Sequence, residues 1–270
     1  MTTTIDTVPS AQIEPTWRRR SARRGVRSEP RLISSLRSEF IKLTTVRAPR
    51  AILALTVLVG GVASFMVARF VDQPGLNVSG MFGFSAIFTA VFAAVSGILL
   101  YTTEAEHGTL HQMFAAEPHR GVVVVAKTIA TAGYAALLGL SGLAAGIAGA
   151  ALGGIPAGDT STIPMAIAWA TGFAVLAGVL GLGIGLVARH SAAAISGVLV
   201  WWLVVESLVG VFAPDRVLRF MPFVAGNGML DIAPEGEEIA FTRPTTALIF
   251  AAYALGALAL GAVVANRTDP

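Results

Sequence analysis

The chain has 270 residues, of which 54% are hydrophobic and 13% are charged, and its formal net charge is +3. With a mean hydropathy of +0.72, it is too apolar and too poor in charge for a water-soluble domain. The absence of cysteine excludes disulfides, thiolate catalysis and cysteine-based metal sites. The composition therefore indicates an integral membrane protein. Its apolar runs are continuous and lack period-two alternation, which predicts helices rather than a barrel.

The N-terminal part is polar and basic. Residues 1–28 are rich in arginine and have no apolar run close behind, so they predict a disordered cytoplasmic tail that meets anionic lipid rather than nucleic acid. A twin-arginine export signal would need its apolar segment directly after the arginines. Over residues 29–46 apolar side chains recur at spacings of three and four, which predicts an amphipathic helix in the interface plane. These apolar residues are Ile33, Leu36, Phe40 and Leu43.

Six apolar runs are each long enough to cross the roughly 30 Å hydrocarbon layer as a helix. We expect spans at about 51–70, 81–101, 122–152, 163–187, 192–212 and 245–265, within a single transmembrane domain over 29–270. The third span is longer than one crossing needs and is expected to tilt or to project beyond the bilayer.

Between the fifth and sixth spans, the segment Val217–Leu230 is apolar but is too short to span and is broken by Pro222. It predicts a re-entrant or interfacial segment on the outer side. A seventh span is the alternative.

Lysine and arginine placement predicts the orientation. The N-terminal segment, Arg120, Lys127, Arg189 and Arg267 all fall on one side of a six-span arrangement. The positive-inside rule places that side in the cytoplasm. We therefore expect a multi-pass protein of the cell (plasma) membrane with both termini cytoplasmic.

A polar segment separates the second and third spans. Thr103 and Glu106, and again Thr109 and Gln112, have the spacing of capping boxes. This predicts two helix starts back to back across Gly108.

A short helix is then expected from Leu110 towards Ala116, ended by Pro118. Leu110, Met113 and Phe114 lie on one face of it. Since a short helix between two spans has no core of its own, this face is predicted to lie on lipid or to dock into another protein.

Two features of the spans are candidates for a substrate path. Glu206 lies well inside the fifth span, where a charge costs about 2.5–3.5 kcal/mol. It is therefore expected to face a protein interior or a water-filled path, unless it lies near the outer interface or is protonated and hydrogen-bonded to a neighbouring helix. Phe84, Phe88 and Phe92 form an apolar ridge on the second span, facing either the path or lipid.

Two other patterns were considered and rejected. His107 and His111 have a metal-binding spacing, but Gly108 and a helix restart separate them, so no metal site is predicted. Residues 121–128 have the spacing of a Walker A loop, but Ala126 stands where the second glycine belongs and the run opens a membrane helix. No enzyme signature is found, so this chain is not expected to be an enzyme.

The polar segment carries a resemblance to a known family. Glu104–Leu110 (EAEHGTL) resembles the E-x-x-x-G-T-[LI] signature that follows the second span in permease subunits of type 2 ATP-binding-cassette exporters. Leu36–Leu43 (LRSEFIKL) resembles the helix that precedes the first span in actinobacterial members, and Met221–Gly226 resembles their outer segment. The resemblance covers about residues 31–267. Glu106 stands where many family members carry a basic residue.

The resemblance implies a cytoplasmic coupling helix that contacts a separate ATPase subunit. The residues carried over are Glu104, Gly108 and Thr109 from the motif and Leu110, Met113 and Phe114 from the coupling face. It also implies two permease chains, identical or different, and two ATPases that bind ATP and Mg²⁺, with no cofactor on this chain. A hydrophobic or amphipathic substrate would move outward between the permeases. The alternatives are a secondary transporter or channel that uses Glu206, and a membrane anchor for a partner enzyme.

Overall fold

The computed structural model describes residues 31–71, 77–78, 81–110, 119–158, 160–230 and 241–267. Over these residues the chain is helical without strands, and six of its helical segments are long and apolar enough to cross a membrane. This confirms the predicted all-helical membrane fold with six spans.

The helices have the following bounds. The six candidate spans are α3 (Arg47–Phe70), α4 (Met81–Glu106), α6 (Arg120–Leu152), α7 (Ile163–Ala188) with the preceding 3₁₀ turn η1 (Thr160–Thr162), the continuous run α8 (Ser191–Val200), η2 (Trp201–Val205) and α9 (Glu206–Phe212), and α12 (Arg243–Arg267). Three shorter helices are α2 (Arg31–Thr45), α10 (Asp215–Leu218) and α11 (Pro222–Gly228). The fifth span thus contains a π-helical turn, η2, in its middle.

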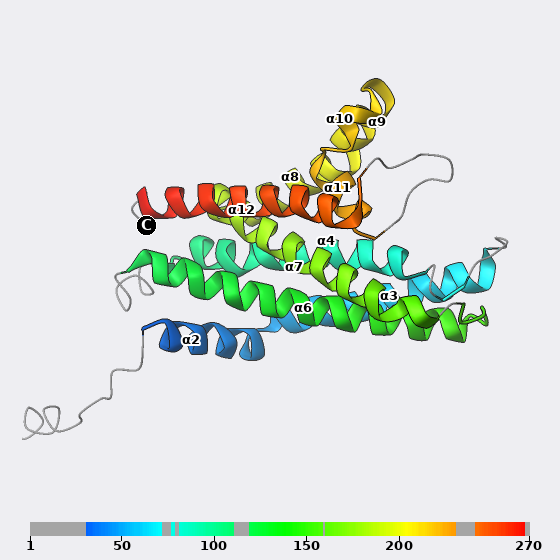
Figure 1. Cartoon of the computed structure of the whole chain (residues 1–270). Coiled ribbons are helices and arrows are strands. Elements are labelled where there is room, and N and C mark those ends of the chain that lie inside the picture. The colour runs from blue at the N-terminus through cyan, green and yellow to red at the C-terminus, as the bar shows by residue number, and fades with distance from the viewer. Residues whose placement is uncertain are drawn as a thin grey trace, which may run out of the picture.

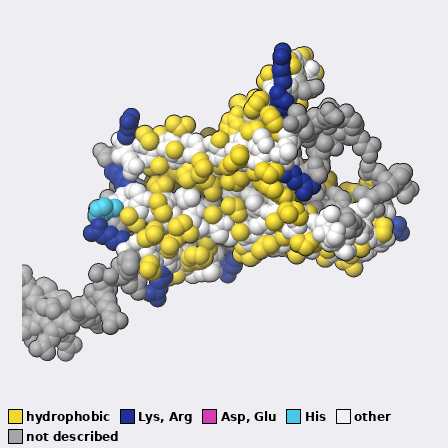
Figure 2. Space-filling view, in the orientation of Figure 1, with side chains coloured by type: hydrophobic (Ala, Val, Ile, Leu, Met, Phe, Trp, Pro, Cys, Tyr) yellow, Lys and Arg dark blue, Asp and Glu magenta, His cyan; other side chains and the backbone are white. Residues whose placement is uncertain are grey.

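Helices α3, α4, α6, α7 and α12 form the body of the molecule and lie side by side (Figure 1). Because the spans are even in number, α12 ends at the same end of the bundle at which α2 begins (Figure 1). Near the opposite end, α9 and α10 protrude from the bundle. On the face in Figure 2, hydrophobic side chains cover most of the middle, and Lys and Arg side chains gather mainly towards the ends.

Close backbone contact holds α4 against α7. A Cβ added at Gly97 would lie 2.0 Å from the carbonyl oxygen of Gly178, and one added at Gly181 would lie 2.0 Å from that of Ala94. Real Cβ atoms cannot approach so closely, so these two helices pack only because glycine is present. Such small-residue seams are common between membrane helices.

Helix α4 is longer than the second span predicted from the sequence. It continues past Tyr101 to Glu106, and the expected helix start at Thr103 is wrong. The Thr103 hydroxyl donates a 2.6 Å hydrogen bond to Leu99 O one turn earlier, as a threonine inside a helix does. The second expected capping box includes Gln112, which lies outside the described residues.

Helix α2 is present, but its orientation differs from the predicted one. Arg31 contacts His119 and Glu39 contacts Lys127, and the sequence separation is 88 in both pairs. A constant separation means that α2 runs alongside the start of α6 in the same direction, whereas a helix in the interface plane would cross the spans. The physical reason is that α2 buries the charged Glu39, while its apolar Phe40 is exposed.

The segment before the last span forms α10 and α11, neither of which is long enough to be a seventh span. Phe223 of α11 stacks on Trp202 of η2, with ring centroids 4.2 Å apart. Phe173 and Phe250 complete this aromatic cluster from α7 and α12. The short helix α11 is therefore part of the core, and its position relative to the bilayer stays a prediction.

Candidate functional site

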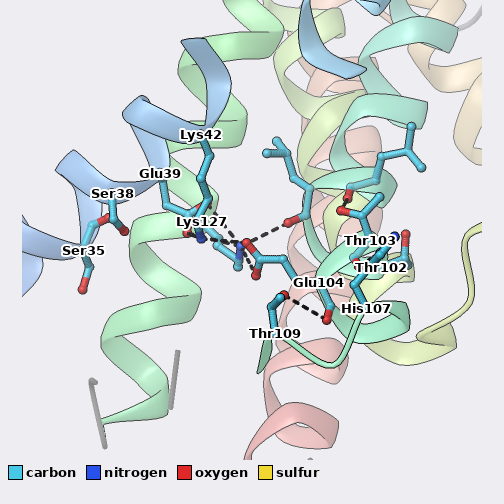
Figure 3. Close-up of polar contacts among 12 residues, drawn as sticks. Ser35, Ser38, Glu39, Lys42, Thr102, Thr103, Glu104, His107, Thr109 and Lys127 are labelled. Carbon is cyan, nitrogen blue, oxygen red and sulfur yellow. Dashed lines mark hydrogen bonds and ion pairs between the residues drawn. The ribbon is translucent and has the colours of Figure 1, made fainter. Parts of the chain in front are cut away.

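Four charged side chains join α2, α4 and α6 at the end of the bundle where α2 begins (Figure 3). We call Glu39, Lys42, Glu104 and Lys127 the charge cluster. Lys127 Nζ lies 2.8 Å from Glu104 Oε2 and 3.2 Å from Glu39 Oε2. Lys42 Nζ lies 2.7 Å from Glu104 Oε1 and 2.8 Å from Glu39 Oε1. Each lysine thus bridges both glutamates, and these are the only two lysines in the sequence.

The charge cluster is mostly removed from solvent. The side chains of Lys127 and Glu39 are 1% and 3% exposed, that of Glu104 is 15% exposed and that of Lys42 is 37% exposed. Lys127 also donates to Leu100 O at 3.1 Å and to the two carboxylate oxygens of Glu39 at 3.3 and 3.2 Å. Buried charges are tolerated when they are paired in this way.

Lys42 remains charged within this arrangement. Burial lowers the pKa of its ammonium, but the neighbouring carboxylates of Glu104 and Glu39 raise it, and the net pKa lies above the ordinary value for lysine. The cluster therefore pairs two lysines with two glutamates.

Gly108 and Thr109 end α4 in a defined turn. Gly108 has a φ of 68°, its N–H donates to Ala105 O, and the N–H of Thr109 donates to Glu104 O at 3.1 Å. This pair of hydrogen bonds is a Schellman motif, in which glycine is favoured because a Cβ would be strained. The hydroxyl of Thr109 donates to the same carbonyl at 3.2 Å.

Glu104 therefore acts in two places at once. Its carboxylate binds Lys42 and Lys127, and its backbone carbonyl holds the turn made by Gly108 and Thr109. The E-x-x-x-G-T spacing thus puts the ion-paired carboxylate on the same residue whose backbone carbonyl closes the turn.

Sequence reasoning missed the partners of Glu104. In the sequence, Lys127 contributes only to the predicted orientation, and Glu39 and Lys42 belong to no predicted site. The available signal was that both lysines and two glutamates lie near predicted span ends, where unpaired charges are costly to bury.

The predicted coupling face is only partly described. Leu110 is 5% exposed and packs inside the chain against Tyr101, Val124 and Leu186. Its role in a coupling face stays a prediction. Met113 and Phe114 lie outside the described residues, so their role as a coupling face stays a prediction.

The histidines near this turn show no metal-binding geometry among the described residues. His107 Nδ1 lies 2.6 Å from Thr103 O. His111, its predicted neighbour at metal-binding spacing, lies outside the described residues.

Glu106 ties the end of α4 to the start of α8. The backbone N–H of Ser191 donates to Glu106 Oε1 at 2.7 Å, and the Ser191 hydroxyl donates to Oε2 at 2.8 Å. His190 Nδ1 lies 3.1 Å from the same carboxylate. A carboxylate at a helix N-terminus satisfies free N–H groups and interacts favourably with the helix dipole. The residue that departs from the family pattern thus contacts its own chain.

Glu206 is 4% exposed and lies within the protein interior. Its carboxylate accepts hydrogen bonds from the N–H groups of Phe223 and Val224, both at 2.9 Å, and from Trp201 Nε1 at 3.1 Å. Phe223 and Val224 are the second and third residues of α11, and Pro222 at the first position has no N–H. Glu206 thus satisfies the free donors of the first turn of α11.

The phenylalanine ridge lies elsewhere on α4. Phe84 is 36% exposed and meets Phe88 edge to face, with ring centroids 5.2 Å apart. Phe92 is half-buried and packs against a cluster that includes Leu43 and Tyr134. No contact among the described residues joins this ridge to Glu206, so a common substrate path through both stays a prediction.

The fold defines a multi-pass helical membrane protein whose ion pairs, within the described part of the chain, lie at one end of the bundle. A family model described as "ABC-2 family transporter protein" matches residues 35–210. The match includes the charge cluster, the Gly108–Thr109 turn and Glu206. The chain therefore belongs to the ABC-2 family of transporter proteins, which confirms the resemblance seen in the sequence. This family is a membrane component of transport and is not itself catalytic. No curated protein matches the chain.

Proposed function

We propose that this chain is the permease subunit of an ATP-binding-cassette exporter that moves a hydrophobic or amphipathic substrate outward across the cell membrane. Its family and its six spans support a role in transport. Energy comes from separate ATPase subunits, which bind ATP and Mg²⁺. Two permease chains act together with two ATPases.

The double role of Glu104 carries this proposal. The polar segment between α4 and α6 follows the turn made by Gly108 and Thr109. Glu104, whose carbonyl closes this turn, is ion-paired with Lys42 of α2 and with Lys127 of α6. Leu110 belongs to a buried cluster that includes residues of α4, α6, α7 and α12. A force applied by an ATPase to this segment would thus reach five helices directly.

A second set of residues supports the proposal that the end of the bundle with the charge cluster faces the cytoplasm. Arg120 at the start of α6 donates to the carbonyl oxygens of Ala265 and Asn266 at 3.1 and 3.2 Å. Arg189 and Arg267 also belong to the helix ends or connections at this end. The positive-inside rule favours placing it in the cytoplasm, with both termini.

The geometry of Glu206 favours an exporter over a secondary transporter or channel. Its carboxylate already accepts three hydrogen bonds from Phe223, Val224 and Trp201. A structural role therefore accounts for this buried acid without any proton or ion path.

The proposal is tested with the purified chain and the ATPase subunit that copurifies with it. The permease alone should hydrolyse no ATP and should stimulate ATP hydrolysis by the ATPase in proteoliposomes. Phe114→Asp should reduce this stimulation about tenfold or more, because a charge desolvated in the contact has no partner. Phe114→Leu is the matched control and should retain most of it. Full stimulation by a correctly inserted Phe114→Asp variant would refute the coupling role.

A further inference from the structure

A cavity of about 800 Å³ lies beside the charge cluster, where α2 turns into α3. Helix α2, the start of α3, the last three turns of α4 and one side chain of α6 form its walls. Most of the lining is apolar and includes Val46, Pro49, Ile52, Leu99, Leu100 and Tyr134. Ligand pockets in proteins have volumes of about 300–1,000 Å³, so this cavity has the size of a binding site.

The polar part of the lining lies at one end of the cavity. Thr103, Glu104 and His107 follow Leu99 and Leu100 along α4, towards the end where the helix stops. Lys42 faces the same region from α2. The cavity is therefore amphipathic, with an apolar interior and a polar end.

The charge cluster determines which head group fits this polar end. Both carboxylate oxygens of Glu104 are already paired with lysines, and Glu39 is only 3% exposed. Lys42 has three N–H donors, and the described residues accept two of them. Lys42 thus keeps one N–H donor for a ligand. A cationic head group would find no unpaired carboxylate and would be repelled by Lys42.

A further positive charge lies at the turn between α2 and α3. The Arg50 guanidinium donates to Thr45 O at 2.7 Å and to Val46 O at 3.4 Å, which holds it over the backbone of this turn. Val46 itself lines the cavity. Arg50 thus adds positive charge on the side of the cavity where α2 meets α3.

We propose that this cavity binds an anionic amphiphile, with its carboxylate or phosphate head at Lys42 and one acyl chain between Leu99 and Ile52. A phospholipid of the bilayer and a free fatty acid share this chemistry. Binding does not depend on the proposed export function, because it is a property of the permease chain alone.

Photoaffinity labelling tests the assignment on the full chain in nanodiscs. Three probes carry the same diazirine in the acyl tail: palmitate, phosphatidylglycerol and phosphatidylcholine. At least one anionic probe should label peptides that contain Ile52, Leu99 or Tyr134, about tenfold more than phosphatidylcholine does, because a charge-assisted hydrogen bond contributes about that factor. Lys42→Gln should remove this preference. Labelling by palmitate alone indicates a free amphiphile, and labelling by phosphatidylglycerol indicates a bilayer lipid.

Two tryptophan variants distinguish labelling inside the cavity from labelling by lipid on the outer surface of the protein. Ala48 is exposed and lines the cavity, so Ala48→Trp should block labelling without disturbing the core. Leu137 is 49% exposed on α6 and does not line the cavity, so Leu137→Trp should leave labelling unchanged. Equal labelling by all three probes, or full labelling of Ala48→Trp, would overturn the proposal. Phe114→Asp should keep full labelling, which distinguishes a failure of this site from a failure of coupling.

Discussion

The carboxylate of Glu104 lies 2.8 Å from the ammonium of Lys127, and these two residues flank the polar segment between α4 and α6 from either side. Their ion pair therefore joins the end of α4 to the start of α6, on the two sides of that segment. Lys127 also binds Glu39 of α2. The position of the polar segment and the position of α2 therefore depend on each other.

Lys127→Met should destabilise the protein strongly. Its removal leaves the buried Glu39 and the largely buried Glu104 to share Lys42 alone, and breaking a buried ion pair costs about 3–5 kcal/mol. The midpoint of denaturant unfolding in detergent micelles measures this effect. Lys42→Met is the matched control and should cost less, because its side chain is 37% exposed. Equal losses for the two variants would contradict the assigned burial.

Gly108→Ala should strain the turn that ends α4. A left-handed backbone conformation costs a residue with a Cβ about 1–2 kcal/mol, and no neighbouring atom lies within 4 Å of the position a Cβ would take, so the effect is purely conformational. We expect lower thermal stability and weaker ATPase stimulation. Gly121→Ala, which also meets no atom but has a helical backbone, should be neutral or stabilising. Wild-type behaviour of Gly108→Ala would refute the role of this turn.

Glu206→Ala should loosen α11. The N–H groups of Phe223 and Val224 lose their acceptors, and loss of a helix cap costs about 0.5–2 kcal/mol. Hydrogen exchange of these two amides should become about tenfold faster, since 1.4 kcal/mol is a factor of ten in an equilibrium. Ser207→Ala, next to it on an exposed site, should leave both amides unchanged. If exchange is unaffected while proton-coupled flux is lost, Glu206 serves transport rather than structure.

The membrane orientation can be tested directly because the chain has no cysteine. Ser79→Cys should react with an impermeant thiol reagent on intact cells, and Ala116→Cys should react only after permeabilisation. The reverse pattern would place the termini outside.

The phenylalanine ridge gives a test of the second permease chain. Phe88→Cys should form a disulfide between two copies if the ridge lies at their contact, whereas Leu137→Cys on α6 should not. Absence of the Phe88 product in a transporting complex would assign the ridge to lipid.

The spans could be predicted from the sequence because hydropathy and the arginine distribution act along the chain itself. The charge cluster could not be predicted, because Glu39 and Lys127 are 88 residues apart and neither segment has a pattern that indicates its partner. The cost of inserting a charge singles out Glu206 in the sequence. Two of its three hydrogen-bond donors are backbone N–H groups of Phe223 and Val224, which leave no pattern in the sequence apart from Pro222.

The predicted helix start at Thr103 is wrong for a physical reason. Thr103 and Glu106 have the spacing of a helix start, yet they belong to the last turns of a helix. A threonine hydroxyl can bond back to a carbonyl one turn earlier as readily as it can cap, so spacing alone does not distinguish the two ends. The glycine at position 108 was the better sequence signal of a helix end, and its φ of 68° in the structure agrees with that role.

Because both lysines lie in one cluster, the rate at which Lys127 is acylated can report on the structure around it. Acylating reagents that modify amines have two lysine targets in the sequence. The side chain of Lys127 is 1% exposed and is paired with Glu39 of α2. Its reaction rate therefore measures how often α2 separates from α6. Mass spectrometry of the acylated peptide could follow that motion during nucleotide turnover without any introduced label.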